Sequence, residues 1–196
     1  DPRVLGPTLE QHGLKLVTGW FSGELRHGNI EREKRRIAPQ LALYQALGAP
    51  VMIYAETTGT VQAKIDTPVA ERPRMPDEEF KSYGDKLTEF AEWLQAEGCP
   101  MAFHHHMGTV VETEHEVDLL MNRTGDAVRL LFDTGHLTFA GGDVLRQLLR
   151  RREVQRARTV GRGRLGGEQA GGEQRVEAGR AGLAAGLAVK RRSLRA

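Results

Sequence analysis

The sequence predicts an α/β fold with about four parallel β-strands, the helices that connect them, and a low-complexity C-terminal tail. Two observations lead to this prediction. Up to about residue 150, short apolar runs alternate with longer stretches whose apolar residues recur at helical spacing. The links between them are short, which is typical of a parallel sheet with right-handed crossovers. Since a closed (β/α)8 barrel needs roughly 250 residues, we expect a partial (β/α)8 barrel.

The first predicted strand and helix cover residues 14–20 and 30–47. Leu14–Trp20 is a mainly apolar run that ends at a loop containing glycine. In the stretch 30–47, charges crowd the first half and apolar residues follow at helical spacing. Asn29 is a suitable N-cap for this helix and Gly48 a suitable C-terminal stop. Pro39 is expected to kink the helix or to split it in two.

The second predicted strand is Pro50–Ala55, and it ends at Glu56. A loop rich in proline follows, and Asp77 is predicted to cap a helix that runs to about Glu97. Apolar side chains line one face of this helix, namely Phe80, Tyr83, Leu87, Phe90 and Leu94. We therefore expect that face to cover the sheet.

The third and fourth predicted strands are Pro100–Phe103 and Val128–Phe132, with a short helix at Glu114–Asn122 between them. A further helix is predicted from Val144 to about Arg152, and no strand follows it. Residues 1–150 therefore supply four strands and their helices.

Residues 151–196 form a tail of a different composition. This tail has no aromatic residue and no Ile, Pro, Asp, Asn or His, and it is rich in Arg, Gly and Ala. Such a chain buries too little apolar surface to offset the entropy of ordering, so we expect disorder or out-of-frame translation of a GC-rich gene. An Arg/Gly-rich arm that binds nucleic acid is the alternative, but it lacks aromatic residues for base stacking.

Composition excludes several classes of protein. The net charge of +2 gives no sign of a nucleic-acid-binding protein. No apolar run approaches the roughly 18–20 residues that span a bilayer, and there is no secretory signal pattern. The single Cys99 has no partner for an internal disulfide, which fits a cytoplasmic location. We expect neither a nucleic acid nor a membrane as a partner; a homo-oligomer is left open.

Ligand-type side chains follow the ends of the predicted strands. The triplet His104-His105-His106 ends the third strand, and Asp133 and His136 lie at the end of the fourth. Ligands gather at the carboxyl ends of parallel strands, and imidazole with carboxylate suits Zn, Mn, Fe or Co. Side chains alternate along a strand, so His104 and His106 share one face and His105 takes the other. We expect the pair to meet Asp133, His136 and Glu56, the residue that ends the second strand.

Other polar residues near the strand ends admit two interpretations. Trp20 can stack on a ring like that of a sugar, or it can simply pack as an amphipathic side chain. Arg72 and Arg74 lie in the loop rich in proline, where a surface position is expected and contact with a polyol is the alternative. Each histidine or acid, taken alone, can also be a structural residue.

At these residues the sequence resembles the inosose dehydratases of inositol catabolism, a branch of the xylose-isomerase-like barrels. The triple histidine before Met107-Gly108-Thr109 is typical of the dehydratase branch, and the pattern Asp133-x-x-His136 of the whole superfamily. The matching stretches are Gly13–Gly23, Ile53–Gln62, Phe103–Glu112 and Leu131–Asp143.

The resemblance implies a hydro-lyase that removes water from scyllo-inosose, a cyclitol ketone, to give a trihydroxycyclohexane dione with the help of Mn or Co. Carried onto this chain, Asp133 and His104 would be metal ligands, although many relatives have a glutamate where His104 stands. His136 would contact substrate or metal and, with Glu56, is a candidate for proton transfer. His106 and Trp20 would contact the substrate.

The family pattern also contains strands that residues 1–150 do not match. The resemblance implies that the first strand and the later strands are absent, and with them a further metal-binding His and Glu. We therefore expect the isolated 196-residue chain to be poorly active or inactive. A metal-dependent sugar isomerase or epimerase and a non-catalytic remnant are the alternatives.

Overall fold

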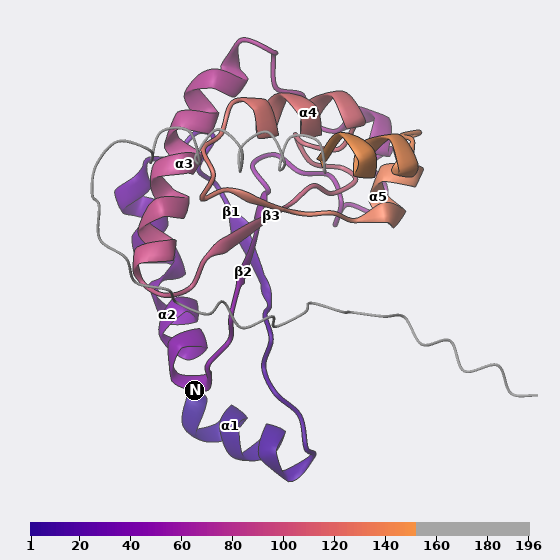
Figure 1. Cartoon of the computed structure of the whole chain (residues 1–196). Helices are drawn as coiled ribbons and strands as arrows, with labels where there is room; N and C mark the ends of the chain where they lie inside the picture. Colours follow the sequence, from indigo (N-terminus) through magenta and orange to yellow (C-terminus); the bar gives the residue numbers. More distant parts are fainter. Residues whose placement is uncertain (152–196) are drawn as a thin grey trace, which may run out of the picture. The chain divides into compact units, whose positions relative to one another are not determined.

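Four parallel strands form one sheet in this protein. A computed structural model describes residues 1–151, and the predictions for the tail, residues 152–196, lie outside the described residues. The strands follow the order β1-β2-β3-β4 across the sheet, so each pairs with the next strand along the chain. This order is that of consecutive β-strand–helix units, as predicted. Figure 1 shows the chain passing from strand to helix and back. The strands are β1 (Trp20–Gly23), β2 (Met52–Glu56), β3 (Met101–His104) and β4 (Arg129–Leu131).

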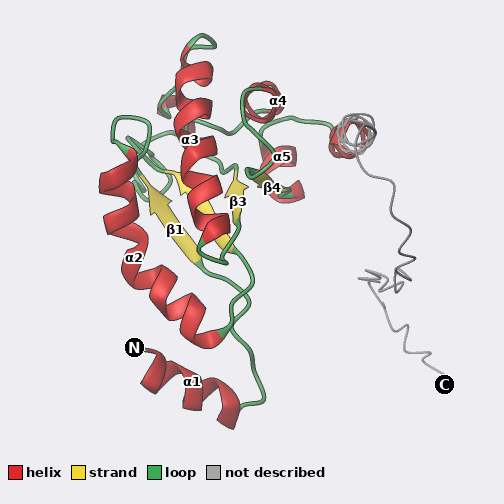
Figure 2. Ribbon diagram, turned by 60° about the vertical axis from the view of Figure 1, so that its left-hand side comes forward, coloured by secondary structure: helices red, strands yellow, loops and turns green. Residues whose placement is uncertain are grey.

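Helices connect the strands and cover one face of the sheet. Helices α2 and α3 lie along that face (Figure 2). They bury a common core against strand residues Phe21, Tyr54 and Phe103. The described helices are α1 (Pro2–Gln11), α2 (Ile30–Leu47), the 3₁₀ helix η1 (Val69–Glu71), α3 (Glu79–Ala96), α4 (Glu114–Asn122) and α5 (Thr134–Phe139), and residues 144–151 are also helical.

The first strand lies further along the chain than predicted. The stretch Leu14–Gly19 has no regular structure, and β1 begins only at Trp20, which aligns with Ile53 of β2. Leu14 and Val17 remain 59% and 62% exposed, so this apolar run is not part of the core. The prediction of a strand at residues 14–20 is therefore wrong. The strand forms at residues 20–23, which pair with β2.

Helix α2 begins and ends as predicted but is not interrupted. Asn29 caps its first turn by accepting a hydrogen bond from the Arg32 amide at 2.8 Å, and Gly48 ends it at φ 68°. Pro39 lies inside one continuous helix, so the predicted split is wrong. Pro39 has no amide hydrogen to donate to the carbonyl four residues earlier in the helix. Because Pro39 is exposed, water can hydrogen-bond to that carbonyl instead.

Helix α3 begins after Glu78, and Asp77 does not cap it. The carboxylate of Asp77 contacts His115 of α4 instead, at 2.9 Å. The apolar face of α3 is buried as predicted. No helix in the described part of the chain has both the length and the apolar character needed to cross a membrane.

Candidate metal centre

Strand alternation sorts the site residues onto the two faces of the sheet. Phe103 of β3 aligns with Tyr54 of β2, and both pack against the helices. His104 is the next residue along β3 and therefore points to the opposite face. It aligns with Leu131 of β4, and Asp133 lies two residues further on the same side. His104 and Asp133 therefore lie together on the face of the sheet opposite helices α2 and α3, which we call the open face.

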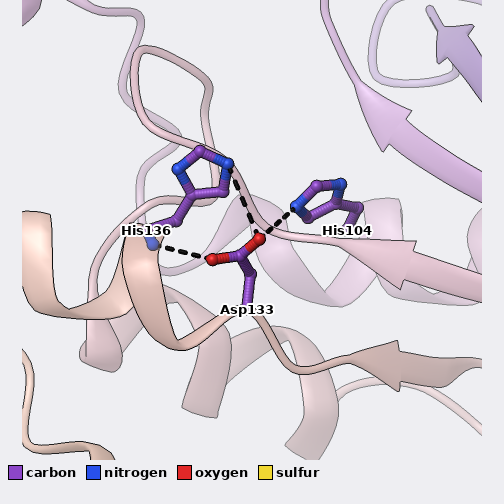
Figure 3. A group of neighbouring side chains, drawn as sticks. All are labelled: His104, Asp133 and His136. Atoms are coloured by element: carbon purple, nitrogen blue, oxygen red, sulfur yellow. Dashed lines mark hydrogen bonds and ion pairs between the residues drawn. The ribbon is translucent and has the colours of Figure 1, made fainter. Parts of the chain in front are cut away.

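Three side chains meet at this end of the sheet. His104, Asp133 and His136 each offer one ligand atom, and the three atoms lie within 4.8 Å of one another. The Oδ2 atom of Asp133 lies 3.4 Å from His104 Nε2 and 3.9 Å from His136 Nε2 (Figure 3). The predicted convergence of these three residues is present in the fold, and we call them the metal cluster.

Backbone contacts hold the carboxylate of Asp133 in place. Its Oδ1 atom accepts a hydrogen bond from the His136 amide at 2.9 Å and so caps helix α5. Its own amide donates to His105 Nε2 at 3.2 Å. His105 is fully buried behind the sheet, as expected from strand alternation. One carboxylate oxygen thus fixes α5, and the other faces the two imidazoles.

The charge states of the cluster favour a cation. Burial lowers the pKa of His104 and of His136, and the neighbouring imidazoles lower both further. Burial would raise the pKa of Asp133, but the His136 amide and the charges of His136 and His104 outweigh it, and that pKa is lowered. Near neutral pH the cluster therefore holds two neutral imidazoles and one carboxylate, the protonation state that binds a divalent metal.

His106 and Trp20 flank the metal cluster. The His106 ring centre lies 3.8 Å from that of His136, and the Trp20 ring lies 5.2 Å from His104 and 5.4 Å from His106. His106 Nδ1 donates to the Met107 carbonyl at 2.7 Å, because a carbonyl can only accept. In the neutral ring Nε2 is then the atom with a lone pair. Trp20 is 36% exposed, so its ring is available to a ligand.

Glu56 does not join the metal cluster, and its predicted convergence is wrong. Register places Glu56 on the face of Tyr54, which is turned toward the helices. Its carboxylate accepts hydrogen bonds from the Arg26 amide at 2.9 Å and the Thr58 amide at 3.1 Å. Burial raises the pKa of Glu56. This carboxylate holds the loop after β1 rather than lining the open face.

Arg72 is buried, against the expectation of a surface position, whereas Arg74 is exposed as expected. The guanidinium of Arg72 lies between Glu112 and Glu116, at 3.3 and 2.8 Å. Sequence reasoning missed this contact. The available signal was the pair of glutamates, four residues apart, that directly follows residues 106–111, which we call the histidine turn.

The residues of the metal cluster fit a divalent ion. His104 Nε2 is buried and makes no hydrogen bond within the described residues, despite the nearby carboxylate. A buried donor atom left in this state calls for a partner. Two imidazoles and a carboxylate are also the ligand set of transition-metal sites with open positions. The fit rests on this donor set, which comes from the ends of β3 and β4.

Comparison with known proteins agrees with this architecture. The sequence model described as "Xylose isomerase-like TIM barrel" matches residues 3–179. The chain belongs to this family. It is 46% identical over 140 residues to the rhizopine catabolism protein MocC of Rhizobium meliloti, covering 71% of this chain and 43% of that protein. It is 33% identical over 150 residues to the inosose dehydratase of Clostridium perfringens, covering 76% of this chain and 50% of that enzyme.

A solved structure agrees with the fold. The probable 3-DHS dehydratase AsbF of Bacillus anthracis superposes with a TM-score of 0.52 at 13% identity, over 71% of this chain and 47% of that one. At this identity the likeness concerns the fold alone. The chain spans about half the length of the relatives it matches. The fold is therefore that of a (β/α)8 barrel family, of which the described residues provide four consecutive strands.

Proposed function

We propose that this chain binds a divalent metal, Mn²⁺ or Co²⁺, at His104, Asp133 and His136 and takes part in the dehydration of an inosose. The observation that carries the proposal is the metal cluster at the open face, with the Trp20 ring beside it. The 33% identity to inosose dehydratases supports the substrate class. Dehydration removes a proton from the hydroxyl-bearing carbon next to the ketone and hydroxide from the carbon beyond it, which breaks one C–H and one C–O bond. The product is water and an enol, which tautomerises to the dione.

The residues of the open face have distinct roles in this proposal. A bound divalent cation supplies Lewis-acid polarisation of a carbonyl oxygen. The Trp20 ring offers an apolar surface to one face of the cyclitol. His106 Nε2, whose lone pair is fixed by the hydrogen bond from Nδ1 to Met107, is placed to hold a proton. Glu56 has no role in this step, because its carboxylate faces the helices.

Product analysis with the 196-residue chain tests the reaction. After chelation, Mn²⁺ or Co²⁺ should restore a slow conversion of scyllo-inosose to the dione, and the metal-loaded chain should bind inosose. His136→Asn should abolish both effects, whereas His12→Asn should leave them unchanged because His12 is the exposed residue at the C-terminal end of α1, away from the metal cluster.

Three other results would contradict the proposal. Conversion of a ketohexose with no action on inosose would identify a sugar isomerase or epimerase. Turnover that does not depend on metal would remove the role of the metal cluster. If neither inosose binding nor product is detected with either metal, the chain is a non-catalytic protein.

A further inference from the structure

Arg72 is a buried cation on a loop. It follows the 3₁₀ helix η1 in the loop between β2 and α3, yet it is only 5% exposed. A buried charge is costly unless it is paired and hydrogen-bonded. Arg72 meets this condition, because Nη2 donates to Glu116 Oε1 at 2.8 Å and Nε lies 3.3 Å from Glu112 Oε1. We call Arg72, Glu112 and Glu116 the Arg72 triplet.

The two carboxylates of the triplet also bind the backbone of the histidine turn. Glu112 Oε2 accepts a hydrogen bond from the Gly108 amide at 2.6 Å. Glu116 Oε2 accepts from the amides of Glu112 and Thr113, at 2.9 and 2.8 Å, and completes the capping box of α4. Both ends of the segment 108–113 are thus tied to the triplet.

A chain of hydrogen bonds runs from Arg72 to His106. Arg72 Nη1 donates to the Thr109 carbonyl at 2.9 Å. The Thr109 hydroxyl donates to the His106 carbonyl at 2.8 Å, and the Thr109 amide reaches the same carbonyl at 3.2 Å. The His106 ring in turn donates to the Met107 carbonyl. Arg72 is therefore linked through one residue, Thr109, to the backbone of His106, whose ring flanks the metal cluster.

The loop that carries Arg72 is seated on the same turn at a second point. The Gly108 carbonyl accepts from the Val61 amide at 3.1 Å and from the Thr60 hydroxyl at 2.9 Å. Gly108 has a φ of 78°, and a Cβ there would lie 3.0 Å from the Gln62 amide nitrogen. The turn and the loop therefore fit closely, and a displacement of one moves the other.

We propose that Arg72 is a positioning residue: it holds the turn of residues 106–111 so that the His106 ring keeps its place beside the metal cluster. A buried ion triplet is weak evidence for stability, since apolar residues can often replace it. The planar guanidinium of Arg72, however, contacts two carboxylates and the Thr109 carbonyl from one rigid group, which a lysine cannot do. The inference rests on the proposed function only in taking His106 to face the substrate.

The test compares Arg72→Lys with the matched control Arg74→Lys. Arg74 lies in the same loop but is exposed. The first measurement is the ¹⁵N signals of the His106 ring in the metal-free chain, which report whether Nδ1 carries the proton. We expect the signals of the Arg74→Lys variant to match the wild-type chain. Arg72→Lys should shift the His106 signals toward a mixture of tautomers.

Two binding measurements separate positioning from general damage. Arg72→Lys should weaken inosose binding to the Mn²⁺-loaded chain by about tenfold, the size of effect expected when one hydrogen bond to the ligand is lost. The affinity for Mn²⁺ should stay within about threefold of wild type, because the metal cluster is left intact. Circular dichroism checks that each variant is folded.

Unchanged His106 signals in a folded Arg72→Lys chain would overturn the inference, even if its melting temperature falls. If that variant does not fold, Glu112→Gln takes its place, because the amide oxygen can still accept from Gly108 while the ion pair is lost. The same criterion then applies. The ring signals need neither metal nor substrate, so failure of the proposed dehydration leaves this test decisive.

Discussion

At the scale of the residue, Asp133 organises the metal cluster through its two carboxylate oxygens. One caps helix α5 and the other faces His104 and His136. His105, behind the sheet, accepts a hydrogen bond from the Asp133 amide. A residue pattern that looks like an isolated ligand motif is therefore also the start of a helix.

Sequence reasoning was accurate for the histidine triplet and failed for Glu56. The two-residue period of a strand suffices to separate His105 from His104 and His106. Glu56 ends its strand in the same way, but the register pairs Tyr54 with Phe103, so Glu56 shares the face of His105. Strand β2 is buried along its whole length, so its own sequence does not show which of its side chains face the helices.

The buried His105 makes the stability of the metal-free chain depend on pH. Burial lowers its pKa to about 4, from an ordinary value near 6.5. Between these values the unfolded chain binds a proton that the folded chain refuses, so stability is complete above pH 6.5 and is lost as the pH falls toward 4. The loss attributable to His105 is at most about 3 kcal/mol.

Urea unfolding of the metal-free chain at several pH values measures this loss. His105→Gln, whose side-chain oxygen can take the place of Nε2 and accept from the Asp133 amide, should flatten the dependence between pH 6.5 and 4. His12→Asn, at the exposed residue that follows α1, serves as the control and should leave the slope unchanged. An equal slope in the wild-type and His105→Gln chains would show that His105 does not resist protonation.

At the scale of the element, helix boundaries were predicted correctly where the expected capping residue makes its contact within its own helix. Asn29 and Gly48 end α2 as predicted, because the cap and the stop are local chemistry. Asp77 failed as a cap because His115, far along the chain, takes its carboxylate. No helix was predicted at Thr134–Phe139 (α5), since this segment is short and contains most of the Asp133-x-x-His136 motif.

Pro39 lies within α2 at an exposed position, which makes the continuity of that helix testable. A proline inside a helix removes one backbone hydrogen bond and clashes with the preceding turn. Pro39→Ala should therefore raise the free energy of unfolding by about 1–3 kcal/mol. Denaturant unfolding monitored by circular dichroism measures it. A variant of equal or lower stability would mean that α2 is not a regular helix through residue 39.

At the scale of the whole molecule, alternation along the chain was enough to predict the sheet and its order. Each strand pairs with its sequence neighbour, as short right-handed connections require. The burial of Arg72 was missed, because its partners lie some forty residues away in the sequence and a pair of glutamates alone does not show which cation the fold brings to them. The division at residue 150, the cytoplasmic location and the homo-oligomer stay predictions.

The central claim is that His104, Asp133 and His136 bind a divalent metal. Calorimetric titration of the metal-free chain with Mn²⁺ tests it most directly. Asp133→Asn keeps an oxygen that can cap α5 but loses the anionic ligand, so Mn²⁺ affinity should fall by at least about 100-fold. Asp77→Asn also removes a carboxylate beside a histidine, on the surface, and should bind Mn²⁺ like the wild-type chain. Equal affinities of the Asp133→Asn and wild-type chains would contradict the account.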